Sequence, residues 1–96
     1  MKKYNATFTR MVLCLRPEIV LIKDTKERER KIIYLEKEIS KKLGISIQAV
    51  IFWRNSERVP MSRVVELADI YNKDVYDFLE KDDENDWFKS IQRFDF

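Results

Sequence analysis

Leu43-Gly44-Ile45-Ser46 separates two runs of residues that have helical character. Gly44 is the only glycine among 96 residues, and glycine reaches a positive φ without a steric penalty, so it can end a helix and turn the chain. Ser46 stands where the next helix needs a side-chain oxygen to cap its free N–H groups. The stretch therefore predicts two helices joined by a tight turn, a helix-turn-helix.

The residues before this turn predict a long helix over residues 25–43. Asp24 and Glu27 have the spacing of a capping box, and Ile32, Leu35 and Ile39 fall on one face. No Gly, Pro, Ser, Thr, Asn or Asp interrupts residues 31–39. Either one helix therefore spans residues 25–43, or the helix bends near Tyr34 without a sequence signal.

The N-terminal residues 5–22 allow two interpretations. A helix with Asn5 as its cap would bring four apolar residues to one face at spacings of i, i+3, i+4 and i+7. A hairpin is the alternative, because Pro17 could begin a turn between two runs of residues that also tolerate strands. The four residues of the helical stripe are Phe8, Met11, Val12 and Leu15.

A helix that begins near Ile47 follows the turn, and three further helices are predicted after it. Pro60 suits the first turn of a helix that ends near Tyr71, with Asn72 as its stop. Asp74 would cap a short helix that contains Val75, Phe78 and Leu79. A charged linker then leads to a last amphipathic stripe, which consists of Trp87, Phe88, Ile91 and Phe94.

The expected fold class is all-α, with a compact helix-turn-helix domain of about five helices and extra segments at both ends. Residues 1–24 are expected to form an N-terminal extension, and residues 25–80 the helix-turn-helix domain. Residues 81–96 would form an acidic linker and a C-terminal amphipathic helix. Both apolar stripes, at 8–15 and 87–94, are expected outside the helix-turn-helix, packed together or across a two-fold axis, where they would hold a dimer.

Composition and charge narrow the class of function. Residues 1–63 carry 15 Lys and Arg against 7 Asp and Glu, whereas residues 64–96 carry 4 against 10. A basic part that contains the helix-turn-helix suits binding to a nucleic-acid phosphate backbone.

The residue types present leave little with which to bind a metal, because the chain has no histidine and Cys14 is its only cysteine. No cofactor or catalytic group is expected. No apolar run is long enough to cross a membrane, so a cytoplasmic protein is expected.

The pattern around the turn resembles the lambda-repressor-like helix-turn-helix regulators, of the phage Cro and XRE types. With Gly44 at the ninth motif position, the core positions are all apolar, and Ser40 is small where the two helices cross. The tail Phe52 to Pro60 and the helix after it resemble the continuation in Cro-type members. The five core positions are Ile39, Leu43, Ile45, Val50 and Trp53.

The resemblance implies roles for individual residues, which are expectations here. The base contacts would be Ile47, Gln48, Ile51 and Phe52, with Gln48 suited to adenine and the apolar residues suited to thymine methyl groups. The phosphate contacts would be Lys37, Lys41, Ser46, Arg54, Asn55, Arg58 and Arg63. The family often has Gln where this chain has Glu36, and an acid cannot make that phosphate contact.

Two classes of function are consistent with the sequence. The first is a sequence-specific transcriptional regulator, a Cro-like repressor that binds a palindromic operator in double-stranded DNA as a homodimer. The alternative is a protein-interaction module on a helix-turn-helix scaffold, such as an antitoxin or a phage-encoded inhibitor, which would use the exposed Ile51 and Phe52 or the acidic tail. No enzyme activity, small-molecule substrate or membrane partner is expected.

Overall fold

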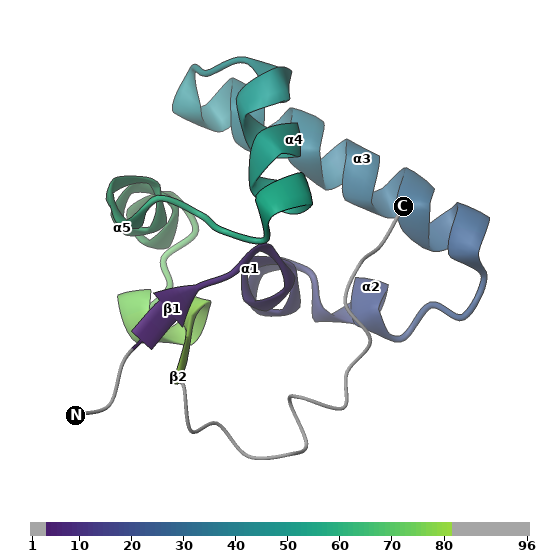
Figure 1. Ribbon diagram of the computed structural model, residues 1–96, viewed down its shortest axis with the longest axis horizontal. Coiled ribbons are helices and arrows are strands. Elements are labelled where there is room, and N and C mark those ends of the chain that lie inside the picture. Colours follow the sequence, from purple (N-terminus) through teal and green to yellow (C-terminus); the bar gives the residue numbers. More distant parts are fainter. Residues whose placement is uncertain (1–3, 82–96) are drawn as a thin grey trace.

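The computed structural model describes residues 4–81, which form five α-helices, one 3₁₀ helix and a two-stranded sheet (Figure 1). The predicted all-α class is confirmed, because this part of the chain is mostly helical. The helices are α1 (Phe8–Leu15), α2 (Pro17–Val20), α3 (Thr25–Leu43), α4 (Ile47–Ser56), α5 (Met61–Ile70) and the 3₁₀ helix η1 (Val75–Phe78). The strands are β1 (Tyr4–Ala6) and β2 (Leu79–Lys81).

Helix α1 decides between the two interpretations of the N-terminal residues in favour of the helix. Thr7, rather than the expected Asn5, is its N-cap, and the Thr7 side chain accepts a hydrogen bond from the Arg10 backbone N–H at 3.1 Å. All four residues of the predicted stripe are buried, and Phe8 and Val12 have no exposed surface. In Figure 1, α1 lies between α4 and α5 on one side and α2 on the other.

The stripe of α1 belongs to the same core as the helix-turn-helix. Phe8 and its neighbours form one buried cluster with Ile32 of α3, Val50 of α4, Val64 of α5 and Phe78 of η1. The expectation that residues 1–24 form a separate extension is therefore wrong, as is the idea that this stripe holds a dimer. The amphipathic pattern predicts that this face is buried, but not which residues cover it. The residues that cover it belong to the same domain. The C-terminal stripe at 87–94 lies outside the described residues.

Helix α3 is one uninterrupted helix, and it begins and ends at the residues that the sequence predicts. The Asp24 carboxylate accepts hydrogen bonds from the backbone N–H groups of Lys26 and Glu27, which confirms it as the N-cap. At the other end Gly44 has φ +68° and ψ +34°, and Ile45 N–H donates to the Ser40 carbonyl at 3.0 Å. These bonds satisfy carbonyls that the end of a helix leaves free, and they reverse the chain towards α4.

The helices after the turn also begin near the residues that the sequence predicts, with side-chain caps on α4 and η1. The Ser46 side chain accepts from Ala49 N–H at 3.3 Å, and α5 begins directly after Pro60. Asn72 takes φ +54° after α5, and Asp74 accepts from Tyr76 N–H at 2.9 Å to open η1. The five core positions are occupied as expected: Ile39, Val50 and Trp53 are buried, and Leu43 and Ile45 are partly buried against them.

A small sheet that the sequence did not predict joins the two ends of the described chain. Strands β1 and β2 are antiparallel, with Asn5 opposite Glu80 and Ala6 opposite Leu79. Leu79 therefore continues as a strand and not as part of the expected short helix. The Ala6 carbonyl also accepts from Val59 N–H at 3.0 Å, which ties the sheet to the loop before α5.

We expect Gly44→Val to lower the free energy of unfolding by about 1–3 kcal/mol, because a β-branched residue is strained at a positive φ. No atom lies within 4 Å of the position that a Cβ would take, so backbone strain and not a clash sets this loss. Gly44→Asn is the matched control, since asparagine tolerates the left-handed region. Urea denaturation measures both variants, and equal stability of Gly44→Val and wild type would contradict the prediction.

Candidate nucleic-acid interface

Helix α4 presents one face to the core and the opposite face to solvent. Val50 and Trp53 are buried, whereas Gln48 and Phe52 are exposed, and Phe52 keeps 67% of its surface accessible. Ile47 and Ile51 lie on the same outer face and are partly buried. The structure thus brings together all four residues that the sequence predicted as base contacts. An exposed phenylalanine on a helix of a small domain is typical of a surface that binds a partner.

Five of the seven predicted phosphate contacts are exposed, on α3, on α4 and in the segments next to α4. Lys37, Lys41, Asn55 and Arg58 are all exposed. Ser46 is also exposed, and its hydroxyl can still donate a hydrogen bond while its oxygen caps α4. The guanidinium of Arg63 is 2.8 Å from the Glu66 carboxylate, so its charge is already partly compensated.

Arg54 is not placed for the predicted role. Its side chain is only 16% exposed, and its Nε lies 3.4 Å from Oε2 of Glu36. Glu36 has 1% of its surface exposed, so it is turned into the core between α3 and α4. Burial raises the pKa of the Glu36 carboxyl, and the nearby Arg54 charge acts in the opposite direction. The prediction of a phosphate contact by Arg54 is corrected to an internal ion pair.

Glu57 is a second acid that the fold turns inward. It follows α4 in the left-handed conformation, with φ +61°, and its carboxylate accepts from Thr9 N–H at 2.8 Å. That N–H is one of the free donors in the first turn of α1, so Glu57 caps α1 from the far end of α4. No local pattern in the sequence predicts this contact, because the two residues are 48 positions apart. Glu36 and Glu57 are thus both engaged in internal contacts, and helix α4 itself carries no acidic residue.

A network of polar side chains lies on a different side of α3 from its contact with α4 and joins α3 to neighbouring helices. Glu38 accepts hydrogen bonds from the Tyr71 hydroxyl and, at 2.9 and 3.0 Å, from Arg16. The ammonium of Lys42 lies 4.6 Å from the centre of the Tyr71 ring. The hydrogen bond from Tyr71 is the main cause of the lowered pKa of Glu38, and burial and this bond together raise the pKa of Tyr71. The network ties α3 to the end of α1 and to α5.

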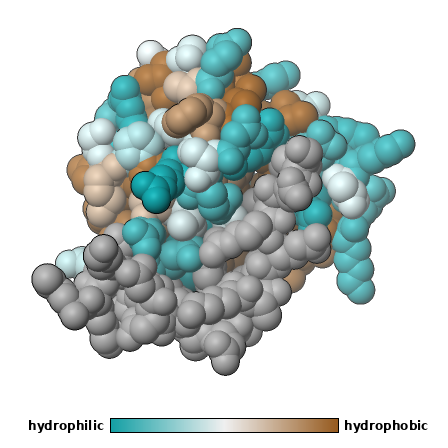
Figure 2. Space-filling model, in the orientation of Figure 1, coloured by the Kyte–Doolittle hydropathy of each residue, from teal (hydrophilic) through white to brown (hydrophobic). Residues whose placement is uncertain are grey.

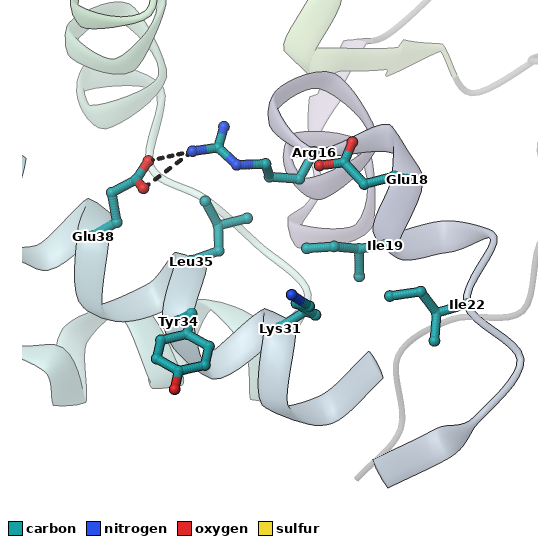
Figure 3. A pocket seen from close by; sticks show the side chains of 8 residues that line it. All are labelled: Arg16, Glu18, Ile19, Ile22, Lys31, Tyr34, Leu35 and Glu38. Carbon is teal, nitrogen blue, oxygen red and sulfur yellow. Dashed lines mark hydrogen bonds and ion pairs between the residues drawn. The ribbon is translucent and has the colours of Figure 1, made fainter. Parts of the chain in front are cut away.

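The Arg16–Glu38 pair also borders a groove of about 270 Å³ between α2 and α3 (Figure 3). Ile19, Ile22 and Leu35 form its apolar lining, and Lys31 lies at its edge. By helical spacing, the residues of α3 that line the groove lie about 90° around the helix from Lys37 and Lys41. It therefore lies apart from the residues predicted to contact DNA.

No protein-family model, curated protein or solved structure matches this chain. Between residues 4 and 81, no helix combines the length and the apolar character that a bilayer span needs. The same part of the chain holds no group of three or more acidic or cysteine side chains that could bind a metal ion.

Proposed function

We propose that this protein is a sequence-specific DNA-binding regulator that inserts α4 into the major groove. The observation that carries the proposal is the outer face of α4, where Gln48 lies beside the exposed Phe52 and the partly buried Ile47 and Ile51. Helix α4 itself carries no acidic residue, and the basic residues Lys37, Lys41 and Arg58 are exposed. A glutamine can make two hydrogen bonds to an adenine edge, and apolar groups suit the thymine methyl group. The inward positions of Glu36 and Glu57 support the proposal, because they keep carboxylates away from the phosphates.

The protein would act as a Cro-like repressor, as a homodimer on a palindromic operator. A two-fold dimer places its two recognition helices in successive turns of the major groove, about 34 Å apart. Occupation of a promoter is enough to block transcription, so this mode of action needs no ligand and no catalytic group. Measurement of mass in solution with and without a duplex tests the dimer, and a single copy per operator would contradict it.

The alternative function, a protein-interaction module, is favoured by the extent of exposed apolar surface. Phe52 borders a shallow hollow with Val59 and Pro60 between α4 and α5, which a protein side chain could fill. A salt titration separates the two functions. Binding to DNA through several phosphates has to weaken steeply as salt rises, whereas an apolar protein contact does not.

Gln48→Ala is expected to cost about 1–3 kcal/mol of binding free energy on the preferred duplex and almost nothing on DNA of arbitrary sequence. The preferred duplex is first selected from a random pool. Arg58→Ala is the control: it should weaken binding to both duplexes alike and reduce the slope of log K against log salt by about 0.9. If Gln48→Ala weakens both duplexes equally, Gln48 does not read a base.

A further inference from the structure

Helix α3 is much longer than the helix-turn-helix needs, and its exposed side carries a continuous row of positive charge. Lys26, Arg30, Lys37 and Lys41 follow one another at spacings of i, i+4, i+11 and i+15, which places them on one face of the helix. All four side chains are exposed. We call these four residues the basic stripe. At a rise of 1.5 Å per residue it is about 22 Å long.

The acids of α3 lie away from the basic stripe. By helical spacing, Glu29, Glu36 and Glu38 lie about 90° or more from its centre, and Glu27 lies about 70° from it. Glu36 is paired with Arg54 and Glu38 with Arg16, so two of the four are already compensated. Within residues 4–81, no carboxylate forms an ion pair with any member of the stripe.

The remaining cations of α3 point elsewhere. Lys42 lies over the Tyr71 ring, and Lys31 borders the groove beside α2. Arg28 lies on the opposite side of the helix from the stripe, by helical spacing. The positive charge of the stripe is therefore concentrated on one face of α3 and is not spread evenly around the helix. In Figure 2, hydrophilic residues gather at the right-hand edge, where Figure 1 places the N-terminal half of α3. Tyr34, which is 63% exposed, lies beside the stripe between its two halves.

We propose that the stripe extends the DNA contact surface, so that Lys26 and Arg30 bind backbone phosphates beyond the helix-turn-helix. This inference rests on the proposed function. The first helix of a helix-turn-helix crosses the DNA backbone, and α3 continues that helix by more than two turns on its N-terminal side. A row of unpaired cations with no acid among them is what a phosphate backbone attracts. The hydroxyl of Tyr34 is a further donor of the kind that contacts phosphates.

The test compares two double variants of the full chain, binding to a short duplex of arbitrary sequence over a range of salt concentrations. Lys26→Gln with Arg30→Gln removes two charges from the stripe. Lys31→Gln with Lys42→Gln removes two charges from the other side of the same helix. The stripe variant should lose about 1.8 from the slope of log K against log salt, because each phosphate contact contributes about 0.9. The control should keep the wild-type slope, and thermal melting should show that both variants are folded.

The outcomes separate this inference from the function on which it rests. If wild type binds with a slope that Arg58→Ala lowers, but the stripe variant keeps the wild-type slope, the DNA-binding function stands and the extended surface is wrong. An equal fall in slope for the stripe variant and its control also overturns the inference, since it would show only the effect of net charge. Failure of wild type to bind any duplex at low salt overturns both.

Discussion

Phe8→Ala is expected to lower the free energy of unfolding by about 3–5 kcal/mol, the usual cost of truncating a buried phenylalanine. Phe8 has no exposed surface, and it belongs to the cluster that joins α1 to α3, α4, α5 and η1. Truncation would leave a void at the centre of this cluster, where several helices meet and none can move inward without losing other contacts. Urea denaturation followed by far-UV circular dichroism measures the change.

The matched control for this prediction is Phe52→Ala, the same substitution on the outer face of α4. Phe52 is 67% exposed, so its loss should change stability by no more than about 0.5 kcal/mol. The comparison discriminates between the domain boundary expected from the sequence and the one in the structure. If Phe8 lay in a separate N-terminal extension, Phe8→Ala would be as mild as the control, and the single core would be wrong.

Arg54→Ala is expected to cost about 3–5 kcal/mol of stability near neutral pH, because it leaves a buried carboxylate without its compensating charge. Glu36 is 1% exposed, and the Arg54 Nε at 3.4 Å is its ion-pair partner. Equilibrium unfolding in urea measures the loss. A second substitution, Glu36→Gln, should recover part of it by removing the isolated charge. If Arg54→Ala is as mild as Arg58→Ala, Arg54 is a solvated surface residue and its role in holding α4 on α3 is wrong.

The same pair predicts a dependence on pH whose sign follows from the raised pKa of Glu36. Above the ordinary pKa of glutamic acid, the folded protein holds this proton more tightly than the unfolded chain does. Stability therefore falls as pH rises through the range between the two pKa values. Arg54→Ala removes the one influence that lowers the pKa of Glu36, so its loss of stability should grow at higher pH and shrink in acid. A loss that is independent of pH would contradict this account.

The sequence was sufficient for the features that neighbouring residues determine. Asp24, Gly44 and Ser46 marked the ends of helices, because a cap acts within three or four residues of itself. The outer face of α4 followed from helical spacing alone, since burial of Val50 and Trp53 leaves Gln48 and Phe52 outside. Whether those side chains contact DNA is a separate matter, which the binding experiments address.

The features that the sequence could not supply depend on residues far apart in the chain. The pairing of β1 with β2 and the capping of α1 by Glu57 are examples, because neither partner carries a local signal for the other. The stripe of α1 was recognised, but periodicity shows only that a face is buried and not what covers it. For the same reason the sequence predicts a phosphate contact by Arg54, because the charge of Arg54 is visible in the sequence and its buried partner Glu36 is not.

The small sheet has a consequence for the order in which this protein can fold while it is being made. Thr7 donates a hydrogen bond to Glu80 at 2.8 Å across 73 positions of the chain, beside the β1–β2 pairing. Phe78, which has no exposed surface, also packs against α1 from that late segment. Helix α1 therefore leaves the ribosome before η1 and β2, and it has to wait for these last elements of the described chain before its core is complete. Synthesis, at about 5–20 residues per second, delays this closure by seconds.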